Sequence, residues 1–247
     1  MGKFTFKKDF MKMFNAKHFI LAMLVVMTGG FFASCGGDDD ELPAAKDSGD
    51  GDPTEFIICP DSKHPHAIDL GLPSGTKWSC CNVGASTPED YGGYYAWGET
   101  EEKSEYSLAT YAHYNSSIGK YVNIGTDIAG TKYDVAHVKM GGVWRMHSRV
   151  QRQEIFNSCS HQWTKKNGVF GILVRGKNGN SIFLPASGYC GKNAIYDAGD
   201  AGYYWSGSFG SSLTDASAYS IHFDSDTWGW YNDYSREFGY SIRAVCP

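Results

Sequence analysis

The chain has 247 residues and a formal net charge of −5, and its first 34 residues, with five Lys against one Asp, contribute +4. The rest of the chain therefore carries −9 (−5 less +4), and such an acidic surface repels the phosphates of DNA and RNA, which excludes nucleic acid as an expected partner. Residues 56–247 are enough for one domain with a substantial core, and they show no internal repeat and no second boundary.

The N-terminal segment has the order of a secretory signal. Lysines fill its first part, an apolar run follows from Phe19 to Met27, and small residues precede the cysteine in Phe32-Ala-Ser-Cys35. The apolar run is shorter than the roughly 20 residues that span a bilayer, so an uncleaved membrane anchor is the weaker alternative. The end of the segment resembles a lipobox, with Phe32 where Leu is more usual. We predict a signal peptide at residues 1–34 and a lipid on Cys35.

The stretch after Cys35 is acidic and poor in apolar residues. Between Gly36 and Glu55 it has eight Asp and Glu side chains against the single Lys46. This composition cannot bury enough apolar area to fold, so residues 35–55 are predicted to be a disordered tether that holds a folded domain away from the membrane. The opening Cys-Gly-Gly-Asp-Asp-Asp resembles surface-displayed lipoproteins of the Bacteroidota, which implies an outer-membrane protein that is lipid-anchored through Cys35 and faces the cell exterior.

Six further cysteines lie in the part expected to be exported. An even number in an oxidising compartment predicts disulfides, and the sequence leaves their connectivity open. If Cys80 and Cys81 lie on a strand, their side chains point to opposite faces. No spacing is Cys-x-x-Cys or a zinc pattern, so neither a metal nor a redox centre is expected. The six are Cys59, Cys80, Cys81, Cys159, Cys190 and Cys246.

The globular part is rich in aromatic residues and glycine, and its segments alternate over short spans, which is typical of β-structure. Residues 67–72 and 77–83 flank Pro73-Ser-Gly-Thr76, in which Pro fixes one φ angle and Gly supplies a positive one. We predict that these two segments form a hairpin.

The middle of the domain is less regular. Residues 94–98 are predicted to form a short strand or a buried turn, and residues 100–140 an irregular excursion whose helical part is 134–140. A clear helix signal follows, because Ser148-Arg-Val-Gln151 fits a capping box. The largely apolar stripe expected on one side of this helix comprises Val150, Glu154, Ile155, Phe156 and Cys159.

The C-terminal part is predicted to consist of strands. Residues 169–175 and 181–185 flank a loop rich in Gly and Asn, and they are expected to form a second hairpin. Short polar loops separate the later strands, so we expect a compact antiparallel sheet there. Its four strands are predicted at 203–208, 218–223, 227–231 and 240–245.

Several sequence motifs occur together in one order. They include Asp69-Leu-Gly-Leu-Pro-Ser-Gly-Thr-Lys-Trp78, Tyr95-Ala-Trp-Gly-Glu-Thr100, Trp144-Arg-Met146, Ile182-Phe-Leu-Pro-Ala186 and Ile242-Arg-Ala-Val245. In this order they resemble the Fibrobacter succinogenes major paralogous domain family of Bacteroidota surface proteins. The resemblance covers about residues 66–246.

The resemblance implies an α+β, C-type-lectin-like fold of the formylglycine-generating-enzyme branch, β-rich, with few helices and a small antiparallel C-terminal sheet. Some relatives are variable proteins of diversity-generating retroelements, in which the end of the chain displays a ligand-binding face. Here Trp230 to Arg243 looks like that segment. The sequence departs from the family after Trp144-Arg-Met146, where relatives commonly have Pro-Thr and then acidic residues.

A candidate ligand-binding face lies near the C-terminus. Twelve of the 38 residues from Tyr203 to Tyr240 are aromatic, against 15% in the whole chain. Aromatic rings give rigid contact area and small polar groups give hydrogen bonds, a mixture typical of binding surfaces. Alternatively, the same aromatics fill the core of the sheet and the polar residues make turns. The candidate residues are Trp228, Trp230, Tyr231, Asn232, Asp233, Tyr234 and Arg236.

Signals for catalysis or for cofactors are weaker. His64 and His66 lack the downstream Glu of a metalloprotease, so a solvated pair is expected. Trp230-Tyr-Asn-Asp233 lacks the spacing of a calcium-dependent lectin, and no nucleophile elbow is present. Enzymes of this fold branch use a late cysteine pair, which Cys190 and Cys246 do not visibly match. No catalytic residue, metal or cofactor is therefore expected.

These observations predict a non-catalytic lipoprotein of the cell surface that binds an external glycan or protein through its C-terminal face. The first alternative is a structural or adhesive subunit of a surface assembly, in which the same face packs against another subunit. The second alternative is an oxidase similar to the formylglycine-generating enzyme.

Overall fold

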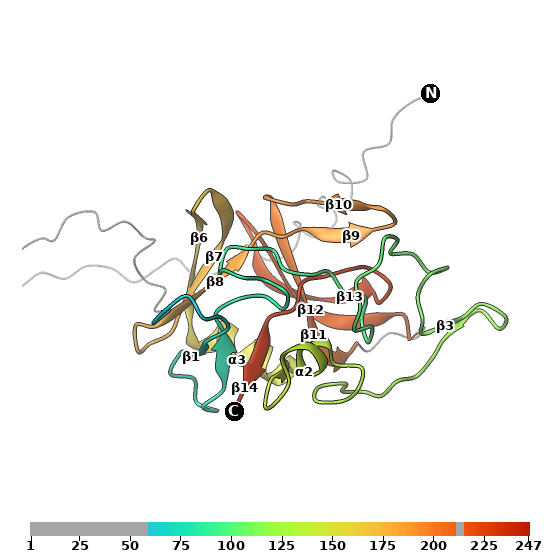
Figure 1. The fold of residues 1–247 in the computed structure, drawn as a ribbon, viewed down its shortest axis with the longest axis horizontal. Coiled ribbons are helices and arrows are strands. Elements are labelled where there is room, and N and C mark those ends of the chain that lie inside the picture. Colours follow the sequence, from blue (N-terminus) through green and yellow to red (C-terminus); the bar gives the residue numbers. More distant parts are fainter. Residues whose placement is uncertain (1–58, 211–214) are drawn as a thin grey trace, which may run out of the picture. The chain divides into compact units, whose positions relative to one another are not determined.

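The computed structural model describes residues 59–210 and 215–247, and for residues 230–234 it describes the backbone alone. The signal peptide, Cys35 and the tether lie outside the described residues. The described part is β-rich, with short antiparallel sheets and two helices, as predicted for the fold class (Figure 1). The helices are α2 (Val135–Met140) and α3 (Arg149–Ser158). The strands are β1 (Ala67–Asp69), β2 (Lys77–Ser79), β3 (Tyr114–Asn115), β4 (Lys120–Tyr121), β5 (Arg145–Met146), β6 (Ser160–Lys166), β7 (Val169–Arg175), β8 (Ser181–Pro185), β9 (Tyr189–Gly191), β10 (Ala194–Tyr196), β11 (Ala201–Phe209), β12 (Ser217–Asp224), β13 (Trp228–Ser235) and β14 (Ala244–Cys246).

The first predicted hairpin is confirmed, with shorter strands than expected. β1 and β2 pair antiparallel with Ile68 opposite Trp78, and the turn between them uses Gly75 at a φ of +73°. Both Ile68 and Trp78 are buried, because alternate residues of each strand face the core. This hairpin forms one side of a four-stranded sheet in the order β1-β2-β14-β5.

The last strand corrects one prediction. The segment 240–245 was expected to complete the C-terminal sheet, but β14 instead lies between β2 and β5. Tyr240 and Ser241 form isolated bridges with Tyr95 and Tyr204, after which the chain crosses to the N-terminal hairpin. Val245 is completely buried opposite Trp78, so its apolar side chain is covered there rather than by β11–β13.

The second predicted hairpin is confirmed with the expected bounds. β7 and β8 pair with Leu173 opposite Phe183, and β6 adds a third strand along the other edge of β7. The sequence pattern missed β6, because its residues Ser160–Lys166 are all exposed or half-buried and carry no apolar alternation.

The C-terminal sheet has the order β11-β12-β13, with β13 at an edge. The predicted strands at 203–208, 218–223 and 227–231 are confirmed and extended at their ends. The register shifts between Trp205 and Phe209 on β11, and again between Ala218 and Ser220 on β12. Such irregularities increase the local twist of a sheet.

Both predicted helices are present. In α3 the Ser148 side chain accepts a hydrogen bond from the backbone N–H of Gln151, and the Gln151 side chain accepts one from Ser148 in return, which completes the predicted capping box. The predicted stripe is wrong at Val150, which is 75% exposed. The helix is turned so that Ile155 and the long side chain of Arg152 face the core, where Arg152 donates to the carbonyl of Ser220.

The irregular excursion at 100–140 is confirmed, since its described elements are the short β3, β4 and α2. Asp134 caps α2 by accepting the backbone N–H of His137. The predicted short strand or buried turn at 94–98 is a buried segment, which Tyr95 joins by a bridge to Tyr240.

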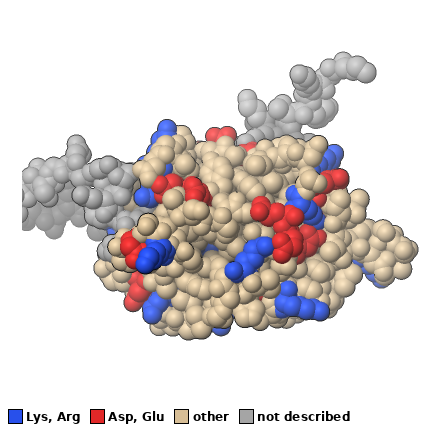
Figure 2. Space-filling model, viewed as in Figure 1, with Lys and Arg blue, Asp and Glu red and all other residues tan. Residues whose placement is uncertain are grey.

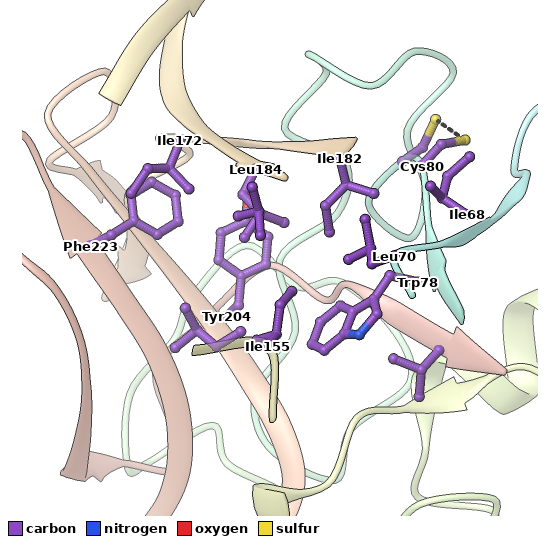
Figure 3. Close-up of a cluster of buried hydrophobic side chains, with 14 of the residues drawn as sticks. Ile68, Leu70, Trp78, Cys80, Ile155, Ile172, Ile182, Leu184, Tyr204 and Phe223 are labelled. Carbon is purple, nitrogen blue, oxygen red and sulfur yellow. Dashed lines mark hydrogen bonds between the residues drawn. The ribbon is translucent and has the colours of Figure 1, made fainter. Parts of the chain in front are cut away.

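Two hydrophobic clusters lie on opposite faces of the C-terminal sheet. Tyr204, Ile221 and Phe223 face the first, which β7, β8 and the N-terminal hairpin complete (Figure 3). Tyr203, Trp205 and Ala218 are among the residues of the second. Because successive side chains of a strand point to opposite faces, one sheet serves both clusters. Each large side chain that is fully buried there contributes about 1.5–3 kcal/mol.

The outer surface is mixed in charge on the face that Figure 2 presents, where Lys and Arg side chains are interspersed with Asp and Glu. None of the helices in residues 59–210 and 215–247 has the length and apolar content that a transmembrane helix requires.

Candidate functional site

Arg236 does not lie on an exposed face, and its inclusion among the ligand-binding candidates is wrong. Its side chain is 0% exposed. The guanidinium donates to the hydroxyl of Tyr111 and to the carbonyls of Asp215 and Val122. It also lies 4.6 Å from the ring centre of Trp97, a cation–π contact. Arg236 therefore holds the excursion against the sheet and has no group to offer a ligand.

Trp228 begins the edge strand β13 and is half-buried. It is paired with Phe223, and its ring lies 4.2 Å from the ring of Phe156 on α3. The imidazole of His161 on β6 stacks on the indole at 5.2 Å. The buried indole N–H of Trp228 has no hydrogen-bond partner among the described residues. Such an unpaired donor is uncommon in folded proteins.

A small hollow opens beside this indole. Its volume is about 70 Å³, and the turn between β12 and β13 forms one wall. Asp224 shapes that turn, because its carboxylate accepts the backbone N–H groups of Asp226 and Thr227. The lining residues are His161, Trp163, Ile172, Asp224, Ser225, Asp226, Thr227 and Trp228.

His161 connects this hollow to a larger one. The second hollow, of about 390 Å³, lies along β6 and β7 and is lined by Ser160, Gln162, Leu173 and Arg175 as well. Partial desolvation lowers the pKa of His161, so its imidazole is neutral and stacks as a neutral ring at physiological pH. The Trp228 surface, defined as Trp228, His161 and the lining of both hollows, thus combines aromatic rings with carboxylates and amides.

The other candidate residues on β13 remain predictions. The side chains of Trp230, Tyr231, Asn232, Asp233 and Tyr234 lie outside the described part of the structure. Their backbone belongs to β13, which runs four residues beyond the predicted end at 231. Trp230 is paired with Ile221, and Tyr231 with Ser220. The predicted face therefore lies on one strand at the edge of a sheet.

A second group of residues meets at the start of the domain. His64 and His66 were predicted to be solvated, but both are half-buried, and Nδ1 of His64 lies 3.2 Å from Sγ of Cys80. One potential ligand atom from each of Cys59, His64, His66 and Cys80 lies within 4.8 Å of the others. The spacing along the sequence, on which the expectation of no metal site rested, did not indicate that these four residues meet.

The cysteines also differ from the predicted disulfides. All six described cysteines are free. β2 ends at Ser79, so strand alternation does not apply to Cys80 and Cys81, and their sulfurs lie 3.4 Å apart (Figure 3). Hydrogen bonds from the Cys59 and Cys81 thiols hold the pKa of the Cys80 thiol below its usual value. The hydrogen bond between Cys59 and Cys80 raises the pKa of Cys59.

One signal in the sequence could have revealed this cluster. The predicted hairpin centred on Pro73-Ser-Gly-Thr76 sets its own register, and continuing that register beyond Ala67 and Ser79 brings His66 opposite Cys80. The backbone N–H of Cys80 indeed donates to the carbonyl of His66. The position of Cys59 had no such signal.

Cys190 and Cys246 lie in different sheets, on β9 and β14. Burial raises the pKa of Cys190 to about 11 and raises that of Cys246 as well. Both groups are therefore thiols at neutral pH rather than the thiolates that react as nucleophiles.

Comparisons of the chain with protein-family models, with curated proteins and with solved structures found no match.

Proposed function

We propose that this protein is a lipid-anchored protein of the outer membrane that binds an external glycan or protein through β13 and the Trp228 surface, without catalysis. Its signal peptide, lipidated Cys35 and acidic tether would display one domain at the cell exterior. The proposal includes the C-type-lectin-like fold and membership of the Fibrobacter succinogenes major paralogous domain family, for which the order of sequence motifs is the support.

The observation that carries the proposal is the environment of Trp228. A half-buried indole with an unpaired N–H stands beside a hollow whose rim includes Asp224 and Asp226. The C–H face of a sugar stacks on an aromatic ring, and its hydroxyl groups bond to carboxylates. A protein loop that presents an apolar side chain and a carbonyl would fit the same groups.

A separate observation weighs against the oxidase alternative. The enzymes of this fold branch use a late cysteine pair, whereas the thiols of Cys190 and Cys246 are held protonated by burial. The oxidase alternative needs a reactive cysteine pair, which these two residues in separate sheets do not supply.

One observation favours the assembly alternative. β13 pairs only with β12 in the described part of the chain, so its outer edge offers backbone N–H and C=O groups to another strand. A subunit that adds a strand there would make this protein a structural or adhesive component of a surface assembly.

The test is a glycan-array and surface-protein binding screen with the full chain in detergent, beside the variant Trp228→Ala. Val150→Ser, on the exposed side of α3, is the matched control. We expect Trp228→Ala to weaken binding at least about tenfold, as truncation of a central Trp does in other interfaces, and Val150→Ser to leave it unchanged.

Unchanged binding by a Trp228→Ala variant that keeps the wild-type circular dichroism spectrum would refute the assignment of the site. Binding partners that attach equally well to both variants and form mixed assemblies by size-exclusion chromatography would favour the subunit alternative.

A further inference from the structure

The cluster of Cys59, His64, His66 and Cys80 is assembled by the first hairpin. Ala67 is opposite Ser79, and the backbone hydrogen bond from Cys80 to the carbonyl of His66, 3.0 Å long, continues the ladder by one pair. The chain before β1 then folds back so that Cys59 reaches Cys80, with which it shares a hydrogen bond. Four side chains from two segments thus converge on one point.

The distances suit a tetrahedral metal ion. Zinc lies about 2.3 Å from sulfur and about 2.0 Å from imidazole nitrogen, which places the ligand atoms of a tetrahedron about 3.3–3.8 Å apart. Nδ1 of His64 is 3.2 Å and Nδ1 of His66 is 3.7 Å from Sγ of Cys80. All four ligand atoms fall within 4.8 Å of one another, so small side-chain adjustments close the site around an ion.

The surroundings of these ligands also match those of metal centres. Nε2 of His66 lies 3.2 Å from a carboxylate oxygen of Asp61, which leaves Nδ1 as the nitrogen free to bind a metal. Metal-binding histidines usually donate their second N–H to such a carboxylate. The backbone N–H of His66 also donates to Sγ of Cys80, which fixes the position of this sulfur.

A buried cation holds the backbone of this cluster in place. Arg243 is 0% exposed, and its guanidinium donates to the carbonyl of Cys80. No carboxylate among the described residues forms an ion pair with Arg243. The buried guanidinium therefore fixes the backbone at Cys80, the position from which its side chain reaches the other three residues.

We propose that Cys59, His64, His66 and Cys80 bind one Zn²⁺ ion. Two thiolates and two imidazoles in a tetrahedron are a preferred set for this ion. Because the four protein ligands complete the coordination, the ion has a structural role. It fastens the segment that contains Cys59 to the end of β2.

Disulfide formation competes with this site. A bond between Cys59 and Cys80, or between Cys80 and the adjacent thiol of Cys81, would remove a thiolate that the ion needs. Metal binding and these disulfides are mutually exclusive, so the oxidation state of the cysteines decides between them.

The test uses the full chain purified from membranes in detergent without chelator. Zinc content is measured by mass spectrometry, and free thiols are alkylated in denaturant and mapped. The zinc is then removed, and the protein is titrated with Co²⁺, whose sulfur-to-cobalt charge-transfer absorption reports thiolate ligands. We expect about one zinc per chain and unoxidised Cys59 and Cys80.

Variants assign the ligands. Cys59→Ser and His66→Ala are expected to weaken Co²⁺ binding by more than the roughly 100-fold that the loss of a second-shell partner can cost, and Asp61→Asn by about tenfold. Cys159→Ser, a half-buried cysteine outside the cluster, is the control and should bind like the wild type.

The proposal is overturned if the reduced wild-type protein binds neither Zn²⁺ nor Co²⁺, if a disulfide of Cys59 or Cys80 replaces the metal in the purified protein, or if Cys59→Ser and His66→Ala bind like Cys159→Ser. The zinc content of the wild type decides the matter even where a variant fails to fold.

Discussion

The cluster around Cys80 and the Trp228 surface differ in how their polar groups are arranged. At Cys80 the side chains of four residues converge on one point, and buried Arg243 braces the backbone beside them. At Trp228 the imidazole of His161 stacks on the indole, the indole N–H has no partner among the described residues, and the adjoining hollow opens to solvent. We propose that a small ion completes the first arrangement and that an external ligand binds at the second.

The largest effect is expected from removing the cation beside the Cys80 cluster. Arg243 donates to the carbonyls of Ser79, Cys80 and Phe183 and to the side-chain oxygen of Asn82. Arg243→Met leaves these buried acceptors unpaired, so we expect the free energy of unfolding to fall by about 3–5 kcal/mol.

Urea denaturation followed by circular dichroism measures this change, and the exposed Arg149→Met serves as the control, with an expected loss of less than about 1 kcal/mol. Similar small losses in both variants would show that Arg243 does not hold the backbone around Cys80.

The next effect is the dependence of stability on pH, to which His147 should contribute much more than His161. His147 is buried in the N-terminal region, where its Nδ1–H donates to the carbonyl of Arg243, and burial lowers its pKa to about 3 from 6.5. The unfolded chain therefore binds a proton that the folded chain does not, between pH 6.5 and 3. The stabilisation is complete above pH 6.5 and is lost as the pH falls toward 3.

Denaturation at successive pH values tests this expectation. The wild type should lose up to about 1.4 kcal/mol per pH unit more than His147→Gln, which keeps an N–H donor and does not titrate. His161→Gln, in the exposed Trp228 surface, should change the slope much less. Equal slopes in all three proteins would contradict the assignment of the effect to burial.

The smallest effect is expected at Trp228 itself, when the indole is replaced by a smaller ring without an N–H. Trp228→Phe keeps a ring against Phe156 and Phe223, and the lost donor had no partner among the described residues. We expect the free energy of unfolding to change by less than about 1 kcal/mol, while binding of the ligand found in the screen weakens. A large loss of stability with unchanged binding would place this indole with the core and not with a site.

The elements that the sequence predicted share one property, which is that their signals are local. The turn at Pro73-Ser-Gly-Thr76 fixed the register of the first hairpin, and Ser148 with Gln151 fixed the start of α3. Predictions that depended on distant contacts failed. The composition around Arg236 could not reveal that Tyr111, 125 positions away, takes its guanidinium, and the residues of β14 do not state which sheet they join.

The sequence by itself therefore determined the β-rich class, both hairpins, both helices and the capping box of α3, because each depends on residues a few positions apart. Only the tertiary structure decided that Arg236 is interior, that β14 closes the N-terminal sheet, and that Cys59 and His64 join His66 at Cys80. These outcomes depend on which apolar faces cover one another, and burial of Val245 against Trp78 is a contact between residues more than 160 positions apart. Packing over such distances brings together chemistry that no spacing along the chain reveals.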